Sequence, residues 1–241
     1  MKLITTLLFS LMMIPLLAVH HEGEGHSMKD KNNFAYLSTY VIPDNTNPKK
    51  LEKSLLGNVE TLEANGYNVC GLLRHQFGAE RGFYTYCYFD DFEQFAEIND
   101  NQDPQADVKQ LHADHSDHLV AVVKKGLKKR TQYILMATYT FGPYLTDNQR
   151  RKNANILYDA YDEAFEGCNL MEHFWGPELA WYVVCGYENY ADFNNKANVL
   201  AAIHEERLAD QKLDVMTHKD CLLYTSPSPR DVEESRMPSS A

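Results

Sequence analysis

Two patterns of apolar residues alternate along the chain and predict its elements. The run at 34–42 is β-branched and aromatic, which favours a strand. Leucine and valine recur at helical spacing within 49–64, and Asn65-Gly66 ends that helix. A hairpin follows at 70–87, then a helix that begins at Asp90-Asp91, breaks at 99–105 and resumes over 106–115, then a short strand at 119–123. This β-α-β-β-α-β order is that of a ferredoxin-like unit.

The second half of the chain shows the same order of elements. A strand at 132–141 ends at Gly142-Pro143, a helix covers 147–165, and a second hairpin covers 168–185. A helix at 189–209 and a strand at 212–217 complete the order. Residues 126–130 (GLKKR) form the linker. We therefore predict an α+β fold of two ferredoxin-like units, at 33–126 and 131–219.

The two hairpins are copies of each other, displaced by 98 residues without a gap. Several residues coincide: Cys70, His75, Gly78, Glu80, Tyr84 and Cys87 recur as Cys168, His173, Gly176, Glu178, Tyr182 and Cys185. Such self-similarity indicates an internal duplication. We therefore expect the two units to share one fold.

The register of each hairpin predicts a disulfide. If each turn is centred on its glycine, at Gly78-Ala79 and at Gly176-Pro177, then Cys70 lies opposite Cys87 and Cys168 lies opposite Cys185. Opposed residues on antiparallel strands have Cα atoms roughly 4.5–5.5 Å apart, and a disulfide requires roughly 4.4–6.8 Å. We predict two disulfides, one in each hairpin. The alternative is four buried thiols, because cysteine packs well as a small apolar residue.

Strand alternation sorts the remaining hairpin residues onto two faces. The cysteines share one face. We expect the other face to line a barrel interior and to bind a ligand: Leu73, His75, Tyr84 and Tyr86 in the first copy, and Met171, His173, Trp175 and Tyr182 in the second. His75 with Tyr84, and His173 with Tyr182, are diagonal neighbours and candidate catalytic residues. Each pair could act as acid and base, could hydrogen-bond a ligand, or could be structural, with the histidine held by Glu80 or Glu178.

The N-terminal residues predict export. Residues 1–18 have the pattern of a signal peptide, with Lys2, an apolar run from Leu3 to Leu17, and Ala18 before the expected cleavage point. The alternative is an uncleaved anchor, although the run is short for a membrane span. Export predicts a periplasmic or extracellular protein without a stable membrane anchor, in an oxidising compartment that favours disulfides. Residues 19–32 then form a polar, flexible leader rich in histidine.

Two histidine-rich stretches are candidate metal sites. Cleavage after Ala18 would give a mature chain that begins Val19-His20-His21, and a free amine with histidine at position three suits Cu(II) or Ni(II). The second stretch is HADHSDH at 112–118, in which His112 and His115 are candidate ligands for Zn²⁺ or Cu²⁺. The alternatives are an accidental histidine cluster and a solvated helix end. We predict no other cofactor.

The C-terminal residues have a different composition from the rest of the chain. Residues 221–241 are rich in Ser, Pro and Arg and show no periodicity. The string CLLYTSPSPRD resembles translated sequencing-adapter read-through, so we predict a non-native, disordered tail from Cys221 onward. The alternative is a genuine disordered tail. If the tail is not native, Cys221 carries no weight, and four cysteines remain, in two matched pairs.

Composition excludes some functions. The formal net charge of −11 would repel nucleic-acid phosphates, and no basic stripe offsets it. The chain has no Gly-x-Ser-x-Gly motif and no phosphate-binding glycine-rich loop, so nothing indicates nucleophilic catalysis. Fifteen tyrosines and 11 phenylalanines are a high aromatic content, which predicts a large packed core or an aromatic-lined pocket.

Two ferredoxin-like units in one chain, each with aromatic strands, resemble the dimeric α/β-barrel superfamily over residues 33–218. The resemblance rests on architecture and repetition, because the chain shows no catalytic motif of that superfamily. It implies two sheets that pair edge to edge into a barrel, with helices outside and a pocket inside. It also implies a monomer that is an internal pseudo-dimer.

Three hypotheses for function follow. The first is an exported protein that binds a small apolar or aromatic molecule between its two units. The second is a cofactor-independent monooxygenase or isomerase of the same fold that uses His75 or His173. The third is a periplasmic copper- or zinc-binding protein. The fold alone does not decide among them.

Overall fold

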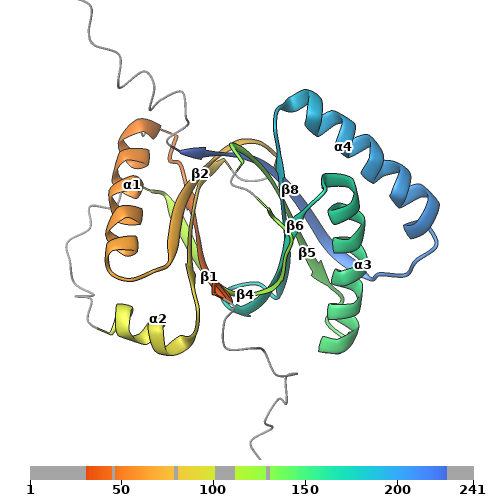
Figure 1. The fold of residues 1–241 in the computed structure, drawn as a ribbon, viewed down its shortest axis with the longest axis horizontal. Helices are drawn as coiled ribbons and strands as arrows, with labels where there is room; N and C mark the ends of the chain where they lie inside the picture. Colours follow the sequence, from red (N-terminus) through yellow and green to blue (C-terminus); the bar gives the residue numbers. More distant parts are fainter. Residues whose placement is uncertain (1–30, 45–46, 79–80, 101–111, 129–130, 227–241) are drawn as a thin grey trace, which may run out of the picture. The chain divides into compact units, whose positions relative to one another are not determined.

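The computed structural model describes residues 31–44, 47–78, 81–100, 112–128 and 131–226 (Figure 1). The predicted signal peptide, almost all of the predicted leader, with His20 and His21, and residues 227–241 lie outside these ranges. Within the described ranges, no helix is both long enough and apolar enough to span a membrane.

The strands of the described chain close into one antiparallel barrel. Their order around the barrel is β1-β3-β2-β8-β5-β7-β6-β4. The bounds are β1 Phe34–Val41, β2 Val69–Gly78, β3 Gly82–Phe89, β4 Asp114–Lys125, β5 Tyr133–Phe141, β6 Cys168–Trp175, β7 Ala180–Tyr187 and β8 Val215–Ser226. The first four strands are contiguous in this order, as are the last four. Pairing of β2 with β8 and of β4 with β6 joins the two halves.

Helices cover the outside of the barrel. They are α1 Pro48–Ala64, α2 Phe92–Asn99, α3 Asp147–Phe165 and α4 Tyr190–Ile203, which continues into a π-helical turn at His204–Leu208. Helices α1 and α2 lie on one side of the barrel, and α3 and α4 on the other (Figure 1). Polar side chains cap the helix starts: Asn47 accepts from the Lys49 amide, and Thr146 forms a capping box with Gln149.

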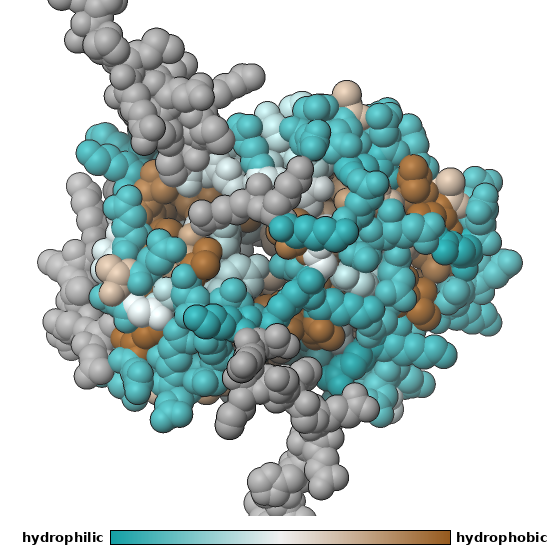
Figure 2. Space-filling view, in the orientation of Figure 1, coloured by the Kyte–Doolittle hydropathy of each residue, from teal (hydrophilic) through white to brown (hydrophobic). Residues whose placement is uncertain are grey.

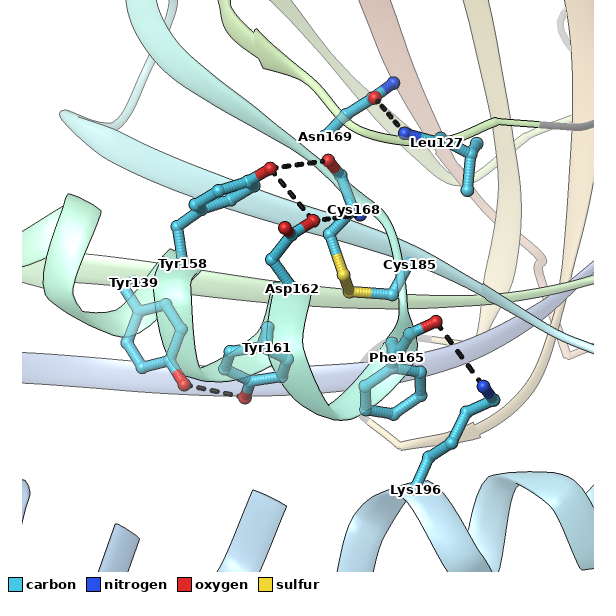
Figure 3. Close-up of a disulfide and its surroundings, with 10 residues drawn as sticks. All are labelled: Leu127, Tyr139, Tyr158, Tyr161, Asp162, Phe165, Cys168, Asn169, Cys185 and Lys196. Atoms are coloured by element: carbon cyan, nitrogen blue, oxygen red, sulfur yellow. Dashed lines mark hydrogen bonds between the residues drawn. A yellow bond between two sulfur atoms is a disulfide. The ribbon is translucent and has the colours of Figure 1, made fainter. Parts of the chain in front are cut away.

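Both predicted disulfides are confirmed. Cys70 is bonded to Cys87 and Cys168 to Cys185, with Cα atoms 4.1 and 4.4 Å apart. In each half the bridge lies on the outer face of the sheet, in a core shared with the helices. The second bridge is further held by Asp162 of α3, which accepts a hydrogen bond from the Cys168 amide at 2.8 Å (Figure 3).

The predicted order of elements is confirmed, but two boundaries are wrong. The helix expected to resume over 106–115 does not include residues 112–115: His115 lies on β4, which begins at Asp114. The disordered tail expected from Cys221 is wrong for 221–226, which form the end of β8. The reason is barrel closure, because β8 pairs with both β2 and β5, and it buries Leu223 completely inside the barrel.

Candidate functional site: a tyrosine-lined cavity in the barrel

A cavity of about 390 Å³ lies inside the barrel. Its walls are made by side chains that alternate inward on the strands, while the cysteines and their neighbours face the helices. The apolar and aromatic lining includes Leu37, Leu73, Tyr84, Tyr86, Tyr88, Ile134, Met136, Met171, Tyr182 and Val184. Figure 2 shows a hollow near the middle of the face in view, with hydrophobic residues beside it. The volume is in the usual range for small-molecule sites.

The two halves contribute unequally to the cavity. Strand β3 supplies three tyrosines, at 84, 86 and 88, whereas the matched positions on β7 hold Tyr182, Val184 and Gly186. Of the two smaller residues on β7, Val184 lines the cavity, whereas the place of a side chain at Gly186 is taken by Thr131, which would lie 2.5 Å from an added Cβ atom. Gly71 on β2 also shapes the wall, because a Cβ atom there would lie 2.5 Å from the Tyr86 ring. Glycine at this position therefore allows the ring of Tyr86 to lie over β2.

A tyrosine and a histidine from opposite halves meet in the wall of the cavity. The Tyr182 hydroxyl lies 3.1 Å from His118 Nδ1, and both residues are buried. The other ring nitrogen of His118, Nε2, lies 3.2 Å from Ser116 Oγ. Burial raises the pKa of the Tyr182 hydroxyl well above its usual value, and the charge of Glu178 adds to the shift. Tyr182 is therefore a neutral hydroxyl at physiological pH, beside an imidazole that can accept or return a proton.

The same contact occurs in the other half with one change. The Tyr84 hydroxyl lies 3.6 Å from Cys221 Sγ. The segments that carry these partners share a pattern, because HSDHL at 115–119 matches HKDCL at 218–222. In both segments the first histidine stacks on a tyrosine of the adjacent strand. The ring centroids are 6.0 Å apart for His115 and Tyr40 and 4.3 Å apart for His218 and Tyr139. Cys221 thus occupies the position that His118 has in the first half.

One end of the cavity carries positive charge. We call this end the mouth, because it is lined by the exposed residues Lys125 and Lys128. Neutral polar residues line the same end: Asn32, Thr131, Asn169 and Thr225. Asn169 Oδ1 accepts a hydrogen bond from the Leu127 amide at 3.1 Å, which leaves the amide nitrogen of its side chain as a donor (Figure 3). Burial raises the pKa of the nearby Tyr88 to about 12, and a hydrogen bond with Asn169 opposes the shift.

The predicted ligand-binding residues divide into two groups. Leu73, Tyr84, Tyr86, Met171 and Tyr182 line the cavity. His75, His173 and Trp175 are outside its lining, and the Trp175 side chain is 73% exposed.

The predicted partners of the two tyrosines are different in the structure. Tyr182 contacts His118 of β4 rather than His173, because its hydroxyl reaches past β6, the strand that lies between β7 and β4. Likewise Tyr84 meets Cys221 of β8. His75 Nε2 and His173 Nδ1 are buried without a hydrogen-bond partner among the described residues.

Sequence reasoning missed His118, which it had placed at a helix end. The recurrence of the H-x-D-x-L pattern at His115 and His218 is the signal that would have identified it. The recurrence was hidden because the two copies lie 103 residues apart, five more than the hairpin copies. In addition, the second copy extends into the stretch whose composition predicts a tail, from Cys221 onward.

The candidate metal ligands can be placed only in part. His112 and His115 have ring centroids 4.9 Å apart. Burial lowers the pKa of His112, and His115 lowers it further. Among the described residues, no group of three histidine, cysteine or acidic side chains is arranged to hold a metal ion. The other candidate ligands, His20 and His21, lie outside the described residues.

Comparison with known proteins supports the fold. No family model matches the sequence, and no curated protein matches it. The structure is similar to that of a protein from Fusobacterium nucleatum described as a candidate monooxygenase, with a TM-score of 0.50 and 10% identity, over 80% of this chain and 91% of that one. A protein of the same description from Lactobacillus acidophilus has a TM-score of 0.48 and 12% identity, over 80% and 93%. The chain therefore has the fold of dimeric α/β-barrel proteins.

Proposed function

We propose that this protein binds a small, mostly apolar or aromatic molecule in the cavity of its barrel. The observation that supports this best is the cavity itself, about 390 Å³ in volume and walled by tyrosines and aliphatic residues. A packed core would fill such a space, since protein interiors contain few voids larger than a water molecule. Burial of an apolar ligand there would contribute roughly 25 cal/mol per Å² of apolar surface.

The cavity can be tested by filling it. Val184 faces the cavity from β7, so Val184→Trp should block it, whereas Val199→Trp places the same residue on the exposed side of α4. The probe is N-phenyl-1-naphthylamine, a neutral aromatic dye whose fluorescence rises in apolar sites. We expect saturable binding in the wild type and in Val199→Trp, and loss of binding in Val184→Trp.

The fold of each variant is checked by near-UV circular dichroism. The smaller change Val184→Phe provides a second test if the tryptophan is not accommodated, and it should weaken dye binding. Undiminished binding in a folded Val184→Trp protein would refute the cavity as the binding site.

A second function is favoured by one specific observation, the contact between His118 and Tyr182 in the cavity wall. We propose as the alternative that the protein is an enzyme of this fold, an isomerase or a cofactor-independent monooxygenase. With the Nδ1–H of His118 donating to the Tyr182 oxygen, which would hold the imidazole in one orientation, Nε2 would exchange its contact with Ser116 for the substrate and take a proton from an activated carbon or hydroxyl. An isomerase would return that proton at another atom, whereas a monooxygenase would also need molecular oxygen as the oxidant.

The two functions predict different contents of the purified protein. Small molecules released by denaturation are compared by chromatography and mass spectrometry between the wild type and His118→Gln. An enzyme should retain a product in the wild type and a chemically distinct substrate in the variant. The same compound in both proteins would argue for binding without catalysis.

We also propose that the chain arose by duplication of a half-barrel and works as an exported monomer. The copied hairpins, the matched H-x-D-x-L segments and the equal order of elements in the two halves support the duplication. Two disulfides suggest an oxidising, exported environment. Mass spectrometry of the mature N-terminus would test the export signal, and sedimentation analysis would test the monomer.

A further inference from the structure

We infer that the ligand of this cavity is amphipathic and anionic, with a carboxylate or similar group held at the mouth by Lys125 and Lys128. This inference rests on the proposed binding function and specifies the class of ligand. The first argument is the sign of the charge. The residues that line the cavity include these two lysines, and no aspartate or glutamate is among them.

The second argument is the way in which Lys125 is held. Its Nζ donates to the carbonyl oxygen of Lys31 at 2.9 Å and to Asn33 Oδ1 at 3.0 Å. Both acceptors are neutral, so these contacts fix the ammonium group in place without cancelling its charge. The neighbouring Lys124 is different, because it pairs with Asp159 at 3.0 Å and lies over the ring of Tyr158 on α3. The lysine at the mouth can therefore attract an anion, whereas the one beside it is already neutralised.

The third argument is the contrast with the rest of the protein. The chain has a formal net charge of −11, which repels anions in general. A local positive mouth on such a protein directs an anion to one place. Two neutral groups at the mouth, the side-chain amide of Asn169 and the hydroxyl of Thr225, are suited to donate to the remaining oxygens of a carboxylate.

The inference also fixes the orientation of the ligand. Lys125 is seven residues beyond His118 on β4, which corresponds to roughly 20 Å along the strand. An anion at the mouth therefore does not contact the His118–Tyr182 pair. The apolar part of the ligand would lie among the tyrosines of β3, and its opposite end would point toward His118.

Two dyes with the same aromatic body test the charge. One is 1-anilinonaphthalene-8-sulfonate, which is anionic, and the other is N-phenyl-1-naphthylamine, which lacks the sulfonate. We expect the wild type to bind the anionic dye more tightly. The double variant Lys125→Gln/Lys128→Gln should bind it about tenfold or more weakly, as expected for the loss of charge-assisted hydrogen bonds. Binding of the neutral dye should stay the same.

The matched control is Lys124→Gln, which removes one positive charge next to the mouth from a side chain that faces α3. It should leave both affinities unchanged. Added NaCl should weaken the binding of the anionic dye and leave the binding of the neutral dye unchanged. If Val184→Trp no longer binds the anionic dye, the dye binds in the cavity and not on the outer surface.

The outcomes separate this inference from the function on which it rests. If neither dye binds in the cavity, the binding function fails, and this inference fails with it. If both dyes bind in the cavity with equal affinity, and the lysine variants change neither, the cavity stands and the anionic ligand is wrong.

Discussion

The disulfides give the sharpest test of how this fold is stabilised. Both bridges join residues 17 apart in sequence, Cys70 with Cys87 and Cys168 with Cys185. A cross-link over a loop of this length removes enough entropy from the unfolded chain to stabilise the folded state by about 3 kcal/mol. Because the loops are equal, the entropic contribution of the two bridges should be equal as well.

We therefore expect the double variants Cys70→Ala/Cys87→Ala and Cys168→Ala/Cys185→Ala each to lose about 3 kcal/mol of the free energy of unfolding. For a domain of this size that corresponds to a fall of roughly 6–12 °C in Tm. The assay is chemical denaturation followed by circular dichroism. Reduction of both bridges in the wild-type protein should lower the free energy of unfolding by the sum of the losses in the two double variants.

Cys221→Ala is the control for this measurement. Cys221 is 3% exposed and lies outside the two bridges, so its substitution removes a buried sulfur without removing a cross-link. The first cysteine of each bridge donates its amide to a carboxylate of the preceding helix, Cys70 to Glu63 and Cys168 to Asp162, and alanine keeps both contacts. A difference between the two double variants would therefore measure the packing around each bridge. If both double variants stay within about 1 kcal/mol of the wild type, the argument from loop length is refuted.

Three further predictions concern the cavity and its titrating groups. Tyr182→Phe should lower the free energy of unfolding by about 1–3 kcal/mol, measured with denaturant, because it removes the hydroxyl that contacts His118. Tyr84→Phe should lower it by less, because the sulfur of Cys221 is a weak acceptor. Equal losses in the two variants would contradict this reasoning. Burial raises the pKa of Tyr139, Tyr161 and Tyr182. The contribution of these neutral tyrosines to stability is therefore fully present below about pH 10 and is lost as the pH rises above about 10. A Tm that does not change between about pH 9 and 11 would contradict this. Burial lowers the pKa of His173 and His204, so on acidification the unfolded chain binds protons before the folded chain does. The free energy of unfolding should therefore fall as the pH drops below about 6.5, and His173→Gln should make this fall less steep.

The sequence by itself predicted the order of elements, the two disulfides and the inward direction of five hairpin residues, although His75, His173 and Trp175, expected on the same face, are outside the cavity lining. These features are local: strand alternation, helical spacing and opposed positions in one hairpin depend only on nearby residues. The copied hairpins made the inference stronger because the same pattern had to satisfy both halves. Leu73, Tyr84, Tyr86, Met171 and Tyr182 were accordingly predicted to face inward, and they line the cavity.

Only the tertiary structure decided which residues meet across the barrel. The His118–Tyr182 contact joins β4 to β7, and the Tyr84–Cys221 contact joins β3 to β8. Each depends on how far one half is shifted against the other, which no local pattern specifies. The same is true of residues 221–226, whose composition indicates a tail, but which pair with two strands because closing the barrel satisfies their backbone and buries Leu223.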